Sequence, residues 1–364
     1  KISSPDSSEV FDTSPSKTYH EQAYIDQTLR LREILKTLPA FAKDYFRAVE
    51  PTTSARTRIS YAYDIRVFFH FLLENNPIYK NYTMDQFRVQ DLERIEPVDI
   101  EEYQEYLKVY KNEEDRQITN TEKGLSRKMS ALRSFYGYYF KRQIISKNPT
   151  LLVDMPKLHE KAIIRLDTDE IAMLLDYVEH GGENLTGQRL AYYEKTKNRD
   201  LAILTLLLGT GIRVSECVGL DVQDVDFKNN GIKVTRKGGN EMVVYFGEEV
   251  EKALKRYLEI REGITPLAGH EHALFYSAQR KRMGVQAVEN MVKKYSRQIT
   301  TTKKITPHKL RSTYGTALYQ ETGDIYLVAD VLGHKDVNTT RKHYAAMKDD
   351  HKRKAAKTVK LREL

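Results

Sequence analysis

The sequence has a single cysteine, Cys217, and no tryptophan among its 364 residues. One thiol excludes an intramolecular disulfide and any cysteine-rich zinc module, and it is typical of proteins from a reducing compartment. We expect Cys217 to be a small buried side chain. The sequence also lacks an apolar run of the roughly 20 residues that a membrane-spanning helix needs. It has no signal peptide pattern, so we expect a cytoplasmic protein; the chain opens at Lys1 rather than Met, as a trimmed N-terminus would.

The chain has many charged residues of both signs. The chain has 59 Lys and Arg residues against 51 Asp and Glu residues, which gives a net charge of +8. A polyanionic partner such as nucleic acid therefore requires that the basic residues gather on particular surfaces. Hydrophobic residues make up 40% and charged residues 30%, a composition typical of globular proteins. The length is enough for two or three domains of about 150 residues each.

Composition and periodicity divide the chain into two mostly helical domains. We expect a flexible lead-in at 1–18, a helical bundle at 19–156, a linker at 157–164, a larger domain at 165–350 and a C-terminal tail at 351–364. In the bundle, apolar residues recur at helical spacing near 24–49, 55–74, 98–110 and 124–142. No alternation of strands and helices is present, so the predicted fold class is mainly α.

The larger domain contains one stretch in which the pattern changes to that of strands. Three short segments have this pattern, at 225–227, 232–235 and 242–246. Asn-Asn-Gly and Gly-Gly-Asn turns separate them, and such turns are typical of hairpins. The sequence therefore predicts a small three-stranded antiparallel sheet within an otherwise helical domain.

Two motifs of the larger domain place arginines near the start of helices. The motif GTGIRVSE puts Arg213 after a tight turn and Glu216 one helical turn later. In the motif TPHKLR, His308 and Arg311 are three residues apart and share one face of a helix. A guanidinium group pairs with two phosphate oxygens and stays protonated, which suits a phosphate site. Either motif alone is more often an ordinary surface feature.

A third motif, LGHKDVNTT, carries His334 and is followed by Tyr344. The ordinary pKa of a tyrosine is near 10. Neighbouring cations lower the cost of forming the phenolate, so that it can act as a nucleophile. Tyrosine occurs 24 times in the chain, so Tyr344 alone indicates little. The three motifs in this order are what point to chemistry on a phosphodiester.

This combination resembles the tyrosine recombinase (integrase) family over most of the chain from about Thr52. The segments GIRVSE, HKLR, LGH, Thr339-Thr340 and Tyr344 carry the resemblance, together with the hairpin segment TRKGG. The segments NRDLAI and VTRKGG, and the helix around LPAF, are most similar to the single-protein Xer recombinases of Gram-positive bacteria. The family usually places its tyrosine nine residues after the histidine of LGH, whereas here His343 holds that position and Tyr344 follows.

The resemblance implies a role for each motif residue. Tyr344 is the nucleophile that leaves a 3′-phosphotyrosyl enzyme, Arg213 and Arg311 clamp the non-bridging oxygens, and Lys237 at the hairpin tip protonates the leaving 5′-oxygen. His308 assists proton transfer, and His334 hydrogen-bonds the phosphate. Glu216 supports the arginines and does not itself react. No metal and no cofactor is implied, and the sequence contains no GxxxxGK[ST] motif for ATP.

The resemblance also implies an architecture and partners. A SAM-like core-binding domain and a catalytic domain clamp a DNA duplex. Four protomers on two DNA sites then exchange strands through a Holliday junction. The reaction serves chromosome dimer resolution or the integration and excision of a mobile element. Partners are double-stranded DNA, further copies of the chain, and an accessory DNA-bending or directionality protein. The tail at 351–364 is expected to dock into a neighbouring copy as a terminal helix, and removal of Val359–Leu364 would test this. No membrane is involved.

Basic residues of the first domain are candidates for DNA contacts. They lie on the helix near 124–142 and after the Ser54 cap, where a helix N-terminus suits a phosphate: Arg127, Lys128, Arg133, Arg56 and Arg58. The alternative for each is a solvated helix face.

Three other functions stay open at this point. One is a monomeric enzyme like the type IB topoisomerases. Another is a metal-dependent nuclease built on Asp221, Asp224 and Asp226, although these acids suit caps of the turn before the first strand. The last is a DNA-binding protein without catalysis. The pair His270 and His272 lacks an evident third metal ligand.

Overall fold

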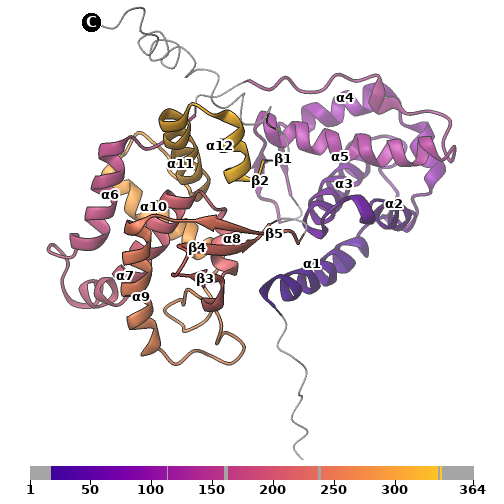
Figure 1. Cartoon of the computed structure of the whole chain (residues 1–364). Coiled ribbons are helices and arrows are strands. Elements are labelled where there is room, and N and C mark those ends of the chain that lie inside the picture. The colour runs from indigo at the N-terminus through magenta and orange to yellow at the C-terminus, as the bar shows by residue number, and fades with distance from the viewer. Residues whose placement is uncertain (1–17, 113, 160–162, 237–238, 335–336, 338–364) are drawn as a thin grey trace, which may run out of the picture. The chain divides into compact units, whose positions relative to one another are not determined.

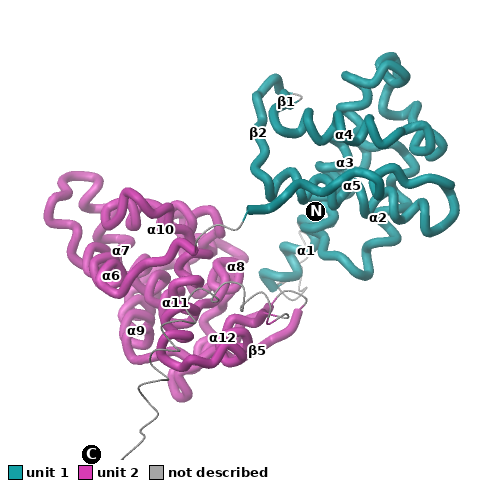
Figure 2. The backbone as a smooth tube through the Cα atoms, turned by 90° about the horizontal axis from the view of Figure 1, so that it is seen from above, with its two compact units in different colours: residues 1–161 teal, residues 162–364 magenta. Residues whose placement is uncertain are grey.

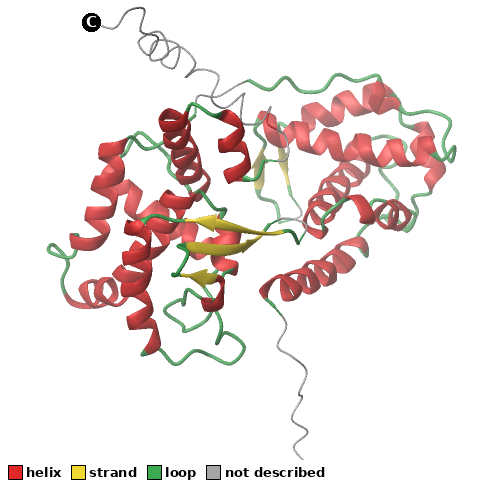
Figure 3. Cartoon of the chain, viewed as in Figure 1, coloured by secondary structure: helices red, strands yellow, loops and turns green. Residues whose placement is uncertain are grey.

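The computed structural model describes residues 18–112, 114–159, 163–236, 239–334 and 337, and its cartoon is shown in Figure 1. The chain divides into two compact units, residues 1–161 and residues 162–364 (Figure 2). Helices dominate both units (Figure 3), which confirms the mainly α prediction. Within the described ranges, no helix combines the length and the apolar character needed to cross a bilayer. The predicted lead-in up to residue 17 and the predicted C-terminal tail lie outside the described residues.

Unit 1 is a helical bundle with one small hairpin. Its elements are α1 (Tyr19–Leu35), α2 (Ala42–Ala48), η1 (Glu50–Thr52), α3 (Ala55–Asn75), η2 (Val89–Arg94), α4 (Pro97–Tyr106), β1 (Val109–Lys111), β2 (Gln117–Thr119), α5 (Glu122–Lys141) and η3 (Pro149–Leu151). Ser54 caps α3 as the sequence predicts, because its hydroxyl accepts a hydrogen bond from the Thr57 N–H at 3.2 Å.

Two expectations for unit 1 were wrong in detail. The predicted helix over 24–49 is two helices, since Pro39 stands in the break between α1 and α2 and cannot continue a helix. The predicted helix over 98–110 ends at Tyr106, and the next residues form the unpredicted antiparallel hairpin β1–β2. Its strands are three residues each, too short for an alternating pattern to be visible in the sequence.

Aromatic side chains fill the core of unit 1. Phe68 of α3 contacts Tyr103 of α4 edge-to-face, with ring centroids 5.1 Å apart, and Tyr45 of α2 meets Phe135 of α5 in the same way at 5.2 Å. All four side chains are buried. Edge-to-face pairs of this kind contribute about 0.5–1.5 kcal/mol each beyond the burial of their area. These pairs hold α3 against α4 and α2 against α5, and α3 and α5 carry the basic residues that the sequence singles out.

Unit 2 contains the three-stranded sheet. Its elements are α6 (Thr168–His180), α7 (Gly187–Thr210), α8 (Val214–Gly219), η4 (Val222–Asp224), β3 (Val225–Asp226), β4 (Gly231–Thr235), β5 (Glu241–Tyr245), α9 (Glu248–Glu262), α10 (Val285–Ile299), α11 (Pro307–Thr322) and α12 (Ile325–Leu332). The strand order β3-β4-β5 is antiparallel throughout, which confirms the predicted sheet.

Helix α7 is the centre of unit 2. In its C-terminal half, residues 201–207 are all buried, and all but Thr205 are apolar. The helix packs against α6, α9 and α11. Since α7 ends where the Arg213 motif begins, and α11 carries Arg311, the packing of α7 on α11 sets the two arginine motifs side by side.

Candidate active site

The turn that carries Arg213 requires a glycine. Gly211 ends α7 with a left-handed φ of 63°, and a Cβ added there would lie 2.4 Å from a ring carbon of Tyr314. Buried Glu216 then holds Arg213 twice. One carboxylate oxygen accepts the Arg213 backbone N–H at 2.7 Å, and the other pairs with Nη1 at 2.6 Å. Glu216 therefore fixes the direction of the Arg213 guanidinium group, whose side chain is 37% exposed.

Arg311 is far more buried than Arg213, with only 5% of its surface exposed. It lies in the second turn of α11, which begins at Pro307 after the cap position Thr306, as the sequence predicts. Its two terminal nitrogens donate to the backbone carbonyls of Gly211 and Leu332. A carbonyl oxygen is neutral, so these bonds orient the guanidinium group and do not cancel its charge.

The two arginines meet at the C-terminal end of α12. Arg311 donates to the carbonyl of Leu332, and Arg213 Nη2 donates to the next carbonyl, that of Gly333, at 3.3 Å. The last carbonyls of a helix have no partner within the helix and carry a partial negative charge, so cations are favourable there. Residues that are about 100 positions apart in the sequence thus converge on adjacent peptide groups.

Both predicted histidines lie next to the arginine motifs along the chain. His334 follows Gly333 directly, its N–H donates to the carbonyl of Ala329 at 2.9 Å, and its side chain is partly buried. His308 is exposed in the first turn of α11, three residues before Arg311. Lys237 and Tyr344 lie outside the described residues, so their predicted roles stay predictions.

A third arginine, which was not predicted as a site residue, contacts the same helix end. Arg236 Nη2 donates to the carbonyl of Val331 at 2.8 Å, and its Nη1 lies 3.5 Å from that of Asp330. We call Arg213, Arg236 and Arg311 the arginine cap of α12. The segment TRKGG contains Arg236, but this motif indicates a function only for the next residue, Lys237. The contacts of the Arg236 side chain with α12 are visible only in the structure.

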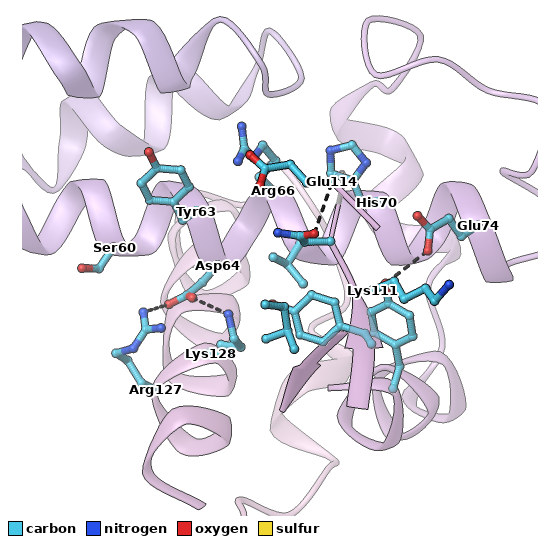
Figure 4. A pocket seen from close by; sticks show the side chains of 15 residues that line it. Ser60, Tyr63, Asp64, Arg66, His70, Glu74, Lys111, Glu114, Arg127 and Lys128 are labelled. Carbon is cyan, nitrogen blue, oxygen red and sulfur yellow. Dashed lines mark hydrogen bonds and ion pairs between the residues drawn. The ribbon is translucent and has the colours of Figure 1, made fainter. Parts of the chain in front are cut away.

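In unit 1, two of the predicted DNA-binding residues share one buried carboxylate. Lys128 Nζ of α5 lies 3.0 Å from an oxygen of Asp64 of α3, and Arg127 pairs with the other oxygen (Figure 4). Burial raises the pKa of Asp64, against the opposing effect of the two cations. Asp64 and Lys128 are buried, whereas 46% of the Arg127 side chain is exposed. These groups line a pocket of about 380 Å³ that Tyr63 and Tyr110 also border.

The other three predicted DNA-binding residues differ in exposure. Arg56 is exposed in the first turn of α3. Arg58 is buried and lies 3.3 Å from Glu50. Arg133 is half-buried and donates to two backbone carbonyls after α5, those of Thr150 and Val153. Arg56 and Arg127 are thus the members of the set with the most accessible charge.

Truncating the shared carboxylate is expected to destabilise unit 1. In an Asp64→Ala variant, Lys128 stays buried without its carboxylate, and loss of one partner of a buried ion pair costs about 3 kcal/mol. Urea unfolding followed by circular dichroism measures the loss. A Lys128→Met substitution added to Asp64→Ala should recover most of it, because no buried charge remains. Equal stability of Asp64→Ala and the unmodified chain would show that the pair contributes nothing.

The three acids considered for a nuclease are used locally. Asp221 and Asp224 form a capping box at η4, with the Asp221 N–H donating to Asp224 at 2.8 Å, and Asp221 pairs with Arg282. Asp226 accepts from the backbone N–H of Lys228 at 2.9 Å. In the part of the chain that the structure describes, no three His, Cys, Asp or Glu side chains gather as a metal site would require.

Cys217 of α8 is buried, as expected from the sequence. Burial raises the pKa of its thiol to about 12. The thiolate is the reactive form, so we expect the native protein not to react with a disulfide reagent such as DTNB at pH 8, and to release one thiol per chain after unfolding in urea. Rapid modification of the native protein would contradict the burial of α8.

Comparison with known proteins gives consistent results. The phage integrase family matches residues 165–351. The chain is 34% identical over 323 residues to the tyrosine recombinase XerC of Caldanaerobacter subterraneus subsp. tengcongensis, covering 86% of this chain and 84% of that protein. It is 30% identical over 348 residues to the tyrosine recombinase XerS of Streptococcus mutans, covering 89% of this chain and 96% of that protein.

Solved structures share the fold. The XerH recombinase bound to a palindromic difH substrate matches with a TM-score of 0.62 and 18% identity, over 83% of this chain and 80% of that one. The Tn1549 transposon integrase in complex with transposon right end DNA matches with a TM-score of 0.59 and 20% identity, over 86% of this chain and 99% of that one. The sequence motifs, the fold and these relatives agree, and the chain belongs to the phage integrase family, as a tyrosine-type site-specific recombinase.

Proposed function

We propose that this chain cleaves and rejoins DNA strands through a 3′-phosphotyrosyl intermediate. The observation that carries the proposal is the convergence of Arg213 and Arg311 on adjacent carbonyls at the end of α12. Two guanidinium groups, one paired with Glu216 and partly exposed and one buried on backbone carbonyls, suit a pentacoordinate phosphate, whose non-bridging oxygens gain negative charge in the transition state. Glu216 keeps the first of them in place, as its contacts with Arg213 indicate.

The remaining roles complete a balanced reaction. The Tyr344 oxygen attacks phosphorus, and His308 assists the removal of its proton. The new oxygen–phosphorus bond forms as the bond to the 5′-oxygen breaks, and Lys237 gives that oxygen a proton. His334 hydrogen-bonds the phosphate. Reversal of the step with a 5′-hydroxyl of another strand rejoins the DNA, and no ATP is needed because the phosphoester is kept.

The proposed substrate is double-stranded DNA. Relatives with this fold were solved as DNA complexes, among them XerH with its difH substrate and the Tn1549 integrase with transposon DNA. In unit 1, Arg56 and Arg127 hold accessible positive charge for the phosphate backbone. We propose that four protomers act on two sites through a Holliday junction, in chromosome dimer resolution or in the movement of a mobile element, with an accessory DNA-bending or directionality protein as a further partner.

Trapping the covalent adduct tests this proposal. A nicked duplex loses a short 5′-hydroxyl fragment after cleavage, so rejoining is prevented and the protein stays attached to the DNA. We expect the adduct to form in the presence of EDTA and mass spectrometry to place it on Tyr344. Cleavage that EDTA abolishes would favour the metal-dependent nuclease. Relaxation of supercoils on any sequence, without junction formation, would favour the topoisomerase-like alternative.

A further inference from the structure

Both the backbone and the guanidinium group of Arg236 form hydrogen bonds. Its backbone stands at the end of β4, where its N–H donates to the Asn240 carbonyl at 2.8 Å and its own carbonyl accepts the Gly239 N–H at 3.0 Å. These bonds close the tip of the β4–β5 hairpin. Its side chain reaches the carbonyls of Val331 and Asp330 at the end of α12. Arg236 therefore bridges the hairpin tip to the helix end on which the other two members of the arginine cap converge.

The bridge is tight at Gly333. This residue ends α12 with a left-handed φ of 61°, and a Cβ added there would lie 1.7 Å from Nη1 of Arg236 and 2.2 Å from its Cζ. The guanidinium group thus packs on the bare backbone of Gly333, in the space that any other residue would fill. The carbonyl of the same Gly333 accepts from Arg213, so Arg236 and Arg213 share one residue as support.

The electrostatics of this place do not favour a third cation by themselves. Arg236 is half-buried, its Nε has no hydrogen-bond partner among the described residues, and the nearby Arg213 adds repulsion. Burial lowers the pKa of Arg236, and Arg213 lowers it further, while Glu216 and Asp330 oppose this. The partial negative charge at the end of α12 offsets part of the cost. A cation placed at such a cost suggests a purpose other than the stability of the hairpin.

We propose that Arg236 is a positioning residue, which fixes the β4–β5 hairpin tip to the end of α12 so that Lys237, the next residue in the sequence, reaches the phosphate held by Arg213 and Arg311. The inference deepens the proposed function and rests on it. Arg236 itself touches no reacting atom. It acts through Lys237, because its bonds to α12 set the point from which the chain continues to that lysine.

A substrate with sulfur in place of the bridging 5′-oxygen tests this role. A thiolate leaves with little need of a proton, so a defect in proton donation disappears on this substrate. On ordinary DNA we expect Arg236→Ala to lower the single-turnover cleavage rate about 100-fold and Lys237→Ala to lower it at least as much. On the sulfur substrate both variants should return to within a few-fold of the unmodified chain, whereas Arg213→Ala should stay slow on both.

Further variants separate positioning from folding. Arg236→Lys keeps a cation that reaches one carbonyl only, and we expect it to restore part of the rate on ordinary DNA. The matched control is Lys228→Ala, which removes an exposed cation at the other turn of the same sheet and should leave the rates unchanged. Thermal unfolding monitors the fold of each variant.

The outcomes are distinguishable. If Arg236→Ala is slow on both substrates while Lys237→Ala is rescued, Arg236 does not act through the lysine and the inference is overturned. Full activity of Arg236→Ala on ordinary DNA overturns it as well. If Lys237→Ala itself is not rescued, the proposed role of Lys237 as proton donor fails, and the inference falls with it.

Discussion

A Tyr344→Phe variant is expected to bind duplex DNA with unchanged affinity and to form no covalent adduct. The phenylalanine ring has no oxygen that could displace the 5′-oxygen, so cleavage should fall below detection, a loss of more than about 10⁴-fold for removal of a nucleophile. A nicked duplex and denaturing electrophoresis measure the adduct, and a mobility shift at fixed salt measures the binding. This is the largest effect that the proposed function predicts.

Tyr326→Phe is the matched control for that experiment. Tyr326 lies on α12, is 71% exposed and plays no part in the proposed chemistry. It should form the adduct at the rate of the unmodified chain. An adduct that persists in Tyr344→Phe would place the nucleophile on another residue. His343 occupies the spacing that the family usually gives to its tyrosine, so the peptide that carries the DNA decides which residue reacts.

Arg311→Ala is expected to show the second largest effect. A guanidinium group aimed at the transferring phosphate contributes about 10³–10⁵-fold to the rate of phosphoryl transfer in other enzymes. The same side chain also joins the end of α7 to the end of α12 through the Gly211 and Leu332 carbonyls, so the variant should lose about 2 kcal/mol of stability. Single-turnover cleavage with protein in excess and urea unfolding measure the two effects.

The control separates catalysis from folding. Arg282 is also a partly buried arginine of unit 2, and its Nη1 donates to the carbonyls of Val218 and Leu220 at 3.1 and 2.8 Å. Arg282→Ala should therefore lose a similar amount of stability and keep most of its cleavage rate at a temperature where it is folded. Arg311→Lys retains the charge but lacks the fork that spans both carbonyls, so we expect an intermediate rate. Equal losses of rate in Arg282→Ala and Arg311→Ala would reduce Arg311 to a structural residue.

Local features of the fold could be predicted well because they depend on near neighbours. Ser54 caps α3, Pro307 starts α11, and the Asn-Asn-Gly and Gly-Gly-Asn turns separate the strands of the sheet, each through contacts within a few residues. The expectations that failed concern short segments, such as the hairpin β1–β2, whose sequence carries too little periodicity. The break at Pro39 was visible in the sequence, but the apolar residues on both sides outweighed it in the helical prediction.

The burial of the basic residues in unit 1 could not be predicted from the sequence. Arg58, Lys128 and Arg133 stand at helical spacing with Arg56 and Arg127, and nothing in that spacing separates them. The fold does, because it buries Arg58 and Lys128 and half-buries Arg133, whereas Arg56 is exposed and 46% of the Arg127 side chain is exposed. Whether a basic side chain is offered to DNA or used within the protein depends on how the helices pack around it.

The motifs and the periodicity of the sequence alone indicated the family, the mostly helical class and the residues from which the chemistry is proposed. A short motif can be recognised from neighbouring residues, without knowledge of where the fold places it. Only the tertiary structure decided that three arginines from α8, α11 and the hairpin tip meet at the end of α12, with Arg236 among them. Such a meeting depends on how α7, α11 and α12 pack, which places residues about 100 positions apart on neighbouring carbonyls. Long-range contacts of this kind produce no regular spacing of residues in the sequence, so they could not be predicted from it.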